Sequence, residues 1–330
     1  MRAVQIVNLE GPDRALELAA DLPEPEPSHM LTPGAGVTVD VHAAGVSFPE
    51  LLQTRGEYQL KPELPFVPGS EVGGVVRSAP DGSSLVPGDR VAAFCALGGF
   101  AEVTVSPDFL TFPLDDELDF DQGAALILNY HTAYFALKLR GRLASGETVL
   151  VHGAAGGVGT AALQVAKGLG ARTIAVVSTD EKENVAREAG ADDVVRSDGP
   201  WKDQAKELTG GAGVNLVLDP VGGDRFLDSL RSLAEGGRVV VVGFTAGSIP
   251  EVRVNRLLLN NTEVIGAGWG AYVMGKPEVC REVGTAIGEL IEGGFVRPIV
   301  GARFPLERTA EALKLLDERA ATGKIVLELA

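Results

Sequence analysis

The stretch that decides the fold is Thr148-Val149-Leu150-Val151-His152-Gly153-Ala154-Ala155-Gly156-Gly157-Val158-Gly159, which runs straight into Thr160-Ala161-Ala162-Leu163-Gln164-Val165-Ala166-Lys167. An apolar, β-rich run ends at a cluster of glycines and an alanine-rich helical pattern begins at once, so the sequence predicts a strand, a glycine turn and a helix. Backbone N–H groups approach a phosphate closely only where side chains are missing, and the positive end of the helix dipole faces the same place. The stretch therefore indicates dinucleotide binding.

The turn departs from the usual glycine pattern at its first position, which is Ala154, and keeps Gly156 and Gly159. A tight strand-to-helix connection without a ligand is the alternative, because such turns occur in many α/β proteins. A second β-rich run, 173–177, follows the helix at the spacing of a βαβ unit. This spacing favours the dinucleotide interpretation.

The residues after this second run bear on which dinucleotide binds. An acid there would hydrogen-bond the ribose 2′-hydroxyl of NAD, but the chain has Ser178-Thr179-Asp180-Glu181-Lys182. Hydroxyl donors and a nearby cation suit a 2′-phosphate better, so we expect NADPH. Arg196 and Ser197, just after the next apolar pair, can close the same phosphate site. The alternative is that Lys182 is a solvated helix residue. Asp180 and Glu181 would repel a phosphate if they pointed inward.

Size and charge set the broad class of the protein. A chain of 330 residues predicts two domains, and its formal net charge of −16 disfavours nucleic acid and anionic membrane surfaces as partners. Only Cys95 and Cys280 are present, so neither a disulfide framework nor a structural zinc site is expected. Without a signal-peptide pattern or a run of about 18 apolar residues, the protein is expected to be cytoplasmic and not bound to a membrane.

Two textures divide the chain. Up to about Leu118, short β patterns are punctuated by glycine and proline, which predicts an irregular antiparallel barrel. These patterns cover 36–42, 71–76, 90–94 and 100–105. From Phe120 helices and strands alternate, starting with a helical stretch at 122–139. Strands are expected at 148–151, 173–177, 193–195, 216–219, 238–242 and 263–265.

Six strands with intervening helices predict an α/β fold with a doubly wound parallel sheet. The remaining segment has helical patterns at 280–292 and 306–322 and a strand at 325–329, and is too short to fold alone. We therefore expect a β-rich domain at 1–120, a dinucleotide-binding domain at 121–265 and a segment at 266–330 that returns to the first domain.

Several motifs together carry a family resemblance that covers nearly the whole chain. They are Ala44-Gly45-Val46-Ser47-Phe48-Pro49-Glu50, Arg55-Gly56-Glu57-Tyr58, the run from Pro65 to Val76, Pro87-Gly88-Asp89-Arg90-Val91, Thr132-Ala133-Tyr134, the glycine turn, Asp219-Pro220-Val221-Gly222-Gly223 and the run from Ala321 to Leu327. In this order they resemble the medium-chain dehydrogenase/reductase superfamily, and within it the zinc-independent, zeta-crystallin-like quinone oxidoreductase branch.

The resemblance implies a GroES-like first domain, a six-stranded Rossmann second domain, NADPH as cofactor, and a homodimer formed by pairing of the Rossmann sheets. Zinc-dependent relatives place a Cys near Ser47 and a His at Ser70, and neither zinc ligand exists here. The four histidines show no clustered spacing, so we expect no metal.

The resemblance also implies which residues contact the cofactor. The pyrophosphate is assigned to the glycine turn, chiefly Gly157 and Val158. Ser178, Thr179, Lys182 and Arg319 are assigned to the adenosine phosphate, and Arg196 is an alternative to Ser197, which stands where the family often has an aromatic or imidazole side chain. The nicotinamide side is assigned to Thr132, Phe244, Thr245, Gly268 and Trp269. Ser47 stands where many relatives have Asn, so a hydrogen bond to the cofactor is lost or shortened there.

Without zinc there is no Lewis acid to polarise an ordinary carbonyl, which favours a conjugated acceptor that delocalises the incoming charge. The sequence therefore predicts NADPH-dependent hydride transfer to a quinone or an activated alkene. The resemblance places Tyr58 as the hydrogen-bond donor to the substrate, with a packed loop aromatic as the alternative. His131 is interpreted as a structural histidine. An enoyl or acryloyl thioester reductase and a redox-silent NADPH-binding protein remain alternatives.

Overall fold

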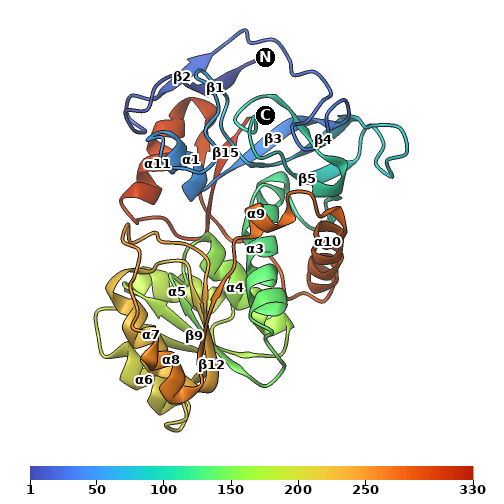
Figure 1. Ribbon diagram of the computed structural model, residues 1–330. Coiled ribbons are helices and arrows are strands. Elements are labelled where there is room, and N and C mark those ends of the chain that lie inside the picture. The colour runs from blue at the N-terminus through green and yellow to red at the C-terminus, as the bar shows by residue number, and fades with distance from the viewer. Residues whose placement is uncertain (330) are drawn as a thin grey trace. The chain divides into compact units, whose positions relative to one another are not determined.

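The computed structural model describes residues 1–329, and its internal contacts divide the chain into two compact units that we describe separately (Figure 1). The β-rich unit consists of Met1–Leu128, Met274–Gly284 and the described residues from Pro298 onward. The α/β unit consists of Asn129–Val273 and Thr285–Arg297. Helix α10 (Pro277–Glu292) belongs partly to each unit. The domain borders expected at residues 120 and 265 stay predictions.

The β-rich unit is built around one seven-stranded sheet with the path β14-β15-β3-β4-β5-β7, and β6 pairs with β3 off this path. Strands β1 and β2 form a separate antiparallel pair. The strands are β1 (Ala3–Ile6), β2 (Leu16–Ala19), β3 (Val37–Val46), β4 (Glu71–Ser78), β5 (Arg90–Phe94), β6 (Val103–Ser106), β7 (Thr111–Pro113), β14 (Val300–Pro305) and β15 (Lys324–Glu328). The helices are α1 (Phe48–Gln53), η1 (Asp108–Leu110), α2 (Phe120–Gly123), η5 (Leu306–Arg308) and α11 (Thr309–Asp317).

Apolar side chains of the long strand β3 hold this unit together. Val39 and Val41 are buried with Val72 of β4, Phe100 and Leu327 of β15 in one core cluster. The last strand pairs antiparallel with β3, with Leu327 opposite Ala44, so strand β15 completes the sheet. Residues from distant parts of the sequence are thereby neighbours.

The expected helix at 306–322 is shorter in the structure. A 3-10 turn precedes helix α11, and the helix ends at Asp317. Arg319 adopts a left-handed φ of 56°, which a continuing α-helix does not tolerate. The sequence pattern predicts too long a helix because residues 306–322 contain no proline or glycine that would mark its end. The end is set instead by the backbone conformation of Arg319.

The α/β unit contains the predicted six-stranded parallel sheet, in the order β10-β9-β8-β11-β12-β13. Its strands are β8 (Thr148–His152), β9 (Arg172–Val177), β10 (Asp193–Arg196), β11 (Val214–Asp219), β12 (Leu233–Val241) and β13 (Glu263–Gly266). From β8 the chain adds β9 and β10 on one side of the sheet, and then β11, β12 and β13 on the other side. This is the doubly wound arrangement, and it confirms the predicted fold class. The edge of β8 that faces β11 is the switch point, where ligands of open α/β sheets bind.

Helices cover both faces of this sheet. In Figure 1, α6, α7 and α8 lie together on one side, and α3 and α4 lie on the other. The helices are η2 (Ile127–His131, which begins in the β-rich unit), α3 (Thr132–Tyr134), η3 (Phe135–Arg140), α4 (Gly157–Gly168), α5 (Asp180–Glu188), α6 (Trp201–Leu208), η4 (Gly223–Arg225), α7 (Phe226–Ser232), α8 (Asn255–Asn260) and α9 (Trp269–Val273). The helical stretch expected at 122–139 is interrupted after α2 and continues with π-helical turns in η2 and η3.

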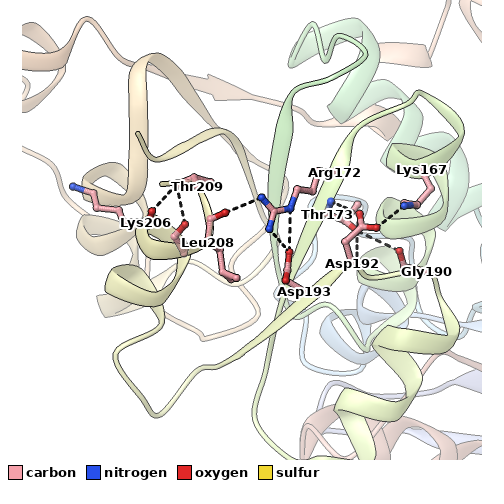
Figure 2. Close-up of polar contacts among 10 residues, drawn as sticks. Lys167, Arg172, Thr173, Gly190, Asp192, Asp193, Lys206, Leu208 and Thr209 are labelled. Atoms are coloured by element: carbon pink, nitrogen blue, oxygen red, sulfur yellow. Dashed lines mark hydrogen bonds and ion pairs between the residues drawn. The ribbon is translucent and has the colours of Figure 1, made fainter. Parts of the chain in front are cut away.

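Polar contacts fix the amino ends of strands β9 and β10, as Figure 2 shows. Arg172 pairs with Asp193 across the two strands at 2.7 Å and donates to the Leu208 carbonyl at the end of α6. Asp192 accepts hydrogen bonds from the Thr173 backbone N–H and from Lys167 of α4. These contacts set the register of both strands, so that Val177 and Arg196 end level with each other.

Among residues 1–329, none of the helices combines the length and the apolar character that crossing a bilayer requires.

A half-buried ion pair links strand β12 to the residue before strand β8 in the α/β unit. Arg238 of β12 is 6% exposed and makes two hydrogen bonds, of 2.6 and 2.8 Å, to the carboxylate of Glu147 just before β8. The Arg238 Nε also donates to the Gly141 carbonyl at 2.5 Å. The hydrogen bonds from Arg238 hold the pKa of Glu147 below its ordinary value of 4.5.

Arg238→Met should lower the free energy of unfolding by about 1–3 kcal/mol, because the Gly141 carbonyl and the half-buried Glu147 carboxylate lose their hydrogen-bond donor. Arg231→Met, which removes an exposed partner of Asp228, should cost less than about 1 kcal/mol.

Since the Glu147 pKa is depressed on folding, the contribution of Glu147 to the free energy of unfolding is present above pH 4.5 and is lost as the pH falls through the lowered value. Urea denaturation should therefore show wild type and Glu147→Gln converging in acid; a pH-independent difference between them would contradict this role.

Candidate functional site

The glycine turn that follows β8 is set by the close approach of its own backbone. Gly153 has a φ of 59°, and the Gly156 N–H donates to the Gly153 carbonyl at 3.0 Å. A Cβ at Gly159 would lie 2.2 Å from that same carbonyl oxygen. Helix α4 can therefore begin against the turn only because position 159 has no side chain.

The start of α4 fits a pyrophosphate. The first residues of a helix have N–H groups without an intrahelical acceptor, and here these are Gly157, Val158 and Gly159. A Cβ added at Gly156 would have only the Gly153 oxygen near it, at 3.5 Å, which is an ordinary contact, so space is open above the turn. Gly157 differs, since a Cβ there would meet the Asn129 amide nitrogen at 2.5 Å.

The carboxyl ends of β9 and β10 bring together several of the residues predicted to bind the 2′-phosphate. A pocket of about 340 Å³ is lined by Ser178, Thr179, Asp180, Arg196 and Asp198. Thr179 caps helix α5, and its hydroxyl accepts a hydrogen bond from the backbone N–H of Lys182 at 3.2 Å. The hydroxyls and the guanidinium predicted for this site therefore share one pocket.

Acidic side chains also line this pocket, a point that the sequence alone did not decide. Arg196 Nη2 forms an ion pair with Asp180 and lies 3.5 Å from a carboxylate oxygen of Glu183. Asp180 is almost fully exposed, so this pair is held in water and is easily exchanged. A phosphate entering the pocket would replace Asp180 as the partner of Arg196. Ser197 lies beside them, with its backbone N–H bonded to the Val177 carbonyl at 2.8 Å.

The residues predicted for the nicotinamide side follow β12. The backbone N–H of Thr245 donates to the Pro220 carbonyl at 3.2 Å, and Phe244 is 38% exposed. The neighbouring turn after β11 is held by Asp219, whose Oδ1 accepts from the N–H groups of Val221 and Gly222 at 2.9 and 2.8 Å. Burial raises the pKa of Asp219. From the sequence, Asp219 was only one member of a motif, and no pattern assigned it to the site.

The other predicted contacts of this unit lie on α3 and α9. Thr132 opens α3 and is 7% exposed, and Trp269 opens α9 and is 2% exposed, with Gly268 exposed beside it. The Trp269 ring meets His131 edge-on with centroids 5.7 Å apart. Trp269 is thus a core side chain in the free protein.

The α/β unit contains two buried, neutral histidines, His131 beside Trp269 and His152 at the end of β8. Burial lowers the pKa of His131 and of His152 to about 3. The His152 Nε2 lies 2.8 Å from the Ser229 hydroxyl, and its ring packs edge-on against Trp201. Neither ring carries a proton to donate as imidazolium at neutral pH, which supports the structural role expected for His131.

Tyr58 and Arg319 lie in the β-rich unit. Tyr58 is half-buried, and burial followed by the charge of Glu50 raises the pKa of its hydroxyl above 10. Arg319 is exposed after α11. The structure does not test the predicted roles of these two residues, which stay predictions.

A buried ionic cluster, consisting of Ser47, Glu50, Ser70, Glu71 and Lys324, lies within the β-rich unit. The Lys324 ammonium donates to the carboxylate of Glu71 and, at 2.5 Å, to the hydroxyl of Ser47. Glu50 accepts from the Ser70 hydroxyl at 2.6 Å and from the Ser47 backbone N–H at 2.8 Å. Burial raises the pKa of the Glu50 carboxyl.

The donor set of this cluster does not fit zinc. Zinc in proteins binds thiolates, imidazoles and carboxylates, whereas Ser47 and Ser70 offer neutral hydroxyls and an ammonium already lies against Glu71. The nearby Cys95 is no substitute, because burial raises its thiol pKa to about 12 and its sulfur donates to the Gly69 carbonyl. In the part of the chain that the structure describes, no three His, Cys, Asp or Glu side chains gather closely enough to hold a metal ion.

Comparison with known proteins matches both units. The family model described as Alcohol dehydrogenase GroES-like domain matches residues 33–116, and the one described as Zinc-binding dehydrogenase matches residues 157–285. A rat protein named Quinone oxidoreductase-like protein 2 is 41% identical over 297 residues, which cover 89% of this chain and 85% of the relative.

Solved structures agree over the full length. A probable oxidoreductase from Mycobacterium abscessus is 44% identical, with a TM-score of 0.88 and coverage of 100% of this chain and 99% of the other. The quinone oxidoreductase from Thermus thermophilus, solved also as its complex with NADPH, is 35% identical, with a TM-score of 0.81 and full coverage of both chains.

The glycine turn gives a matched pair of variants. Gly156→Ala should leave the thermal midpoint nearly unchanged and weaken NADPH binding about tenfold or more, because the new methyl group fills the space expected for the pyrophosphate. Gly159→Ala should destabilise the protein by about 1–3 kcal/mol, because its methyl group overlaps the Gly153 carbonyl. Fluorescence titration with NADPH and thermal denaturation measure the two effects. Unchanged NADPH affinity in Gly156→Ala would exclude this turn as the pyrophosphate site.

Proposed function

Because the chain belongs to the quinone oxidoreductase branch of the medium-chain dehydrogenase/reductase superfamily, we propose that it is an NADPH-dependent, zinc-independent oxidoreductase that transfers a hydride to a quinone. The observation that carries the proposal is the donor set of the buried ionic cluster. Lys324 places an ammonium between Ser47 and Glu71, so the cluster already contains its cation. The Lys324 ammonium would repel a second cation bound by the same side chains.

The choice of NADPH rests on two features of the α/β unit. The glycine turn leaves the first N–H groups of α4 open to a pyrophosphate, and Ser178, Thr179 and Arg196 share the pocket expected for the 2′-phosphate. Relatives of the same fold from Thermus thermophilus and Escherichia coli have been solved with NADPH. NADPH, when bound, supplies the hydride.

A conjugated acceptor suits a site without a Lewis acid. In a quinone or an α,β-unsaturated carbonyl, the charge that accompanies the hydride is delocalised onto oxygen, where hydroxyl donors stabilise it. The half-buried Tyr58 is the donor we assign to this oxygen, and its raised pKa keeps its proton in place as a hydrogen-bond donor. The protein then needs chiefly to align the acceptor with the cofactor.

A steady-state screen of NADPH oxidation tests the proposal. The acceptors are para-benzoquinone, phenanthrenequinone, an alkyl enone and crotonyl thioester, each repeated with NADH and with chelator-treated protein. We expect turnover with the quinones, preference for NADPH and no effect of the chelator. Turnover with the thioester alone would assign an enoyl thioester reductase, and NADPH binding without any turnover would assign a redox-silent binding protein.

Tyr58→Phe should lower kcat about a hundredfold and leave the dissociation constant of NADPH unchanged, because it removes one donor to the developing oxyanion and keeps the ring. Tyr130→Phe, which removes a tyrosine hydroxyl that donates to the Gln164 side chain of α4, is the control. Equal kcat values for Tyr58→Phe and wild type would remove Tyr58 from the mechanism.

We also propose a homodimer formed through β13, in a cytoplasmic protein. Strand β13 ends the six-stranded sheet, and Val264 on it is 38% exposed. Next to it in sequence, α8 exposes Leu258 and Leu259 at 76% each. An edge strand beside such an apolar surface is suited to pairing with a second copy. The buried, unpaired Cys95 and Cys280 suit a reducing compartment.

Replacing Leu258 and Leu259 together by Glu should convert the dimer to a monomer at micromolar concentration, measured by light scattering after size-exclusion chromatography. Val86→Glu, which changes an apolar residue that is 58% exposed in the β-rich unit, should leave the dimer intact. A wild-type protein that elutes as a monomer would contradict the proposed assembly.

A further inference from the structure

The charged and polar side chains of the buried ionic cluster are almost completely shielded from solvent. Its members are at most 8% exposed, with Ser47 at 8%, Ser70 at 5%, Lys324 at 3%, Glu50 at 1% and Glu71 at 0%. Taking an ammonium and two carboxyl groups out of water is costly, and replacing such groups by apolar residues is often neutral or stabilising. Packing stability therefore does not explain why these side chains are present.

The hydrogen bonds of the two serines differ in direction. Ser70 donates its hydroxyl hydrogen to Glu50 Oε1 at 2.6 Å. Ser47 instead accepts from the Lys324 ammonium at 2.5 Å, so its own hydroxyl hydrogen points away from the ammonium. Within residues 1–329, no hydrogen bond uses that hydrogen, and Ser47 is the most exposed member of the cluster. Ser47 is thus the cluster's available donor.

The ammonium behind Ser47 is held in a fixed position. Lys324 opens strand β15, and its Nζ is bound by Glu71 of β4. The second carboxylate oxygen of Glu71 accepts from the Leu128 N–H at 2.8 Å, which fixes the carboxylate in turn. A Cβ at Gly45 would lie 2.7 Å from the Lys324 side chain, so the neighbouring strand β3 makes room for it. An ammonium that donates to a hydroxyl makes that hydroxyl a better donor.

We propose that Ser47 delivers the proton that completes the reduction, and that Lys324 is the positioning residue that resupplies it. This inference rests on the proposed function. The acceptor gains a hydride at carbon and a proton at oxygen, the latter from the Ser47 hydroxyl. As that O–H bond breaks, Ser47 Oγ takes a proton from the Lys324 ammonium, and solvent later returns a proton to the resulting amine. In sum, acceptor, NADPH and one proton become reduced acceptor and NADP⁺.

The two donors of the β-rich unit then have separate tasks. Among residues 1–329 no ammonium donates to the Tyr58 hydroxyl, so Tyr58 stabilises charge on the acceptor and has no partner that would return a proton to it. Ser47 has a proton source directly behind it. Loss of Ser47 should therefore affect the isotope sensitivity of turnover, whereas loss of Tyr58 should not.

The test uses Ser47→Ala and Ser47→Thr in the full-length protein, assayed with NADPH and phenanthrenequinone. We expect turnover of the wild-type protein to be slower in heavy water. Ser47→Ala should lower kcat about a hundredfold, leave the dissociation constant of NADPH unchanged and lose this slowing. Ser47→Thr keeps a hydroxyl and should restore most of the rate. Ser106→Ala, which removes a buried hydroxyl of the same unit outside the cluster, should stay within about twofold of wild type.

Lys324 is tested by the double variant Lys324→Met with Glu71→Gln, which removes both charges together and avoids a buried unpaired carboxylate. It should reproduce the loss of rate and of the solvent isotope effect. Active wild type alongside a Ser47→Ala variant of equal kcat and isotope effect would overturn this inference alone. A wild-type protein that oxidises NADPH with none of the acceptors would overturn the proposed function and this inference with it.

Discussion

Strand β8 and helix α4 can meet only because position 159 has no side chain. A Cβ there would lie 2.2 Å from the Gly153 carbonyl oxygen, which belongs to the turn itself. This contact fixes where the first N–H groups of α4 lie relative to the carboxyl ends of β9 and β11, the two neighbours of β8. The pocket at Ser178 and Arg196, and the turn held by Asp219, take their positions from the same sheet. This steric requirement therefore positions the start of α4, and the strand ends of the sheet position the pocket and the Asp219 turn beside it.

The β-rich unit depends on a comparable constraint, which is electrostatic. Lys324 is buried with Glu71 and Ser47 although the three residues come from different strands and loops of the sheet. Space for the lysine exists because Gly45 has no side chain. Beside its two carboxylates the cluster contains neutral hydroxyls and an ammonium, a donor set that does not fit zinc.

The sequence predicted the sheet and the glycine turn well, because both depend on local patterns. Continuous apolar strands and the spacing of a βαβ unit are visible in about 20–30 residues. Arg196 also follows from position, as it ends a strand next to β9. The end of α11 did not follow, since it depends on the left-handed backbone of Arg319.

The side-chain pairs were the part that sequence could not predict. Asp180 was recognised as a charge that would repel phosphate, but its pairing with Arg196 depends on the pairing of β9 and β10, which brings the start of α5 beside the end of β10. Lys324 belonged to a motif without a role of its own, because its partner Ser47 lies 277 residues away and only strand pairing brings them together. Ion pairs of this kind are properties of tertiary packing, and no spacing rule along the chain reports them.

Hydride transfer from NADPH to a quinone without zinc is tested by a single-turnover measurement. Protein with a verified zinc content below about one-tenth of an equivalent would be saturated with NADPH, mixed rapidly with phenanthrenequinone and followed by NADPH absorbance. We expect complete oxidation of the bound NADPH in one exponential phase, at the same rate after zinc is added. Bound NADPH that persists, or that is oxidised only after zinc is added, would contradict it.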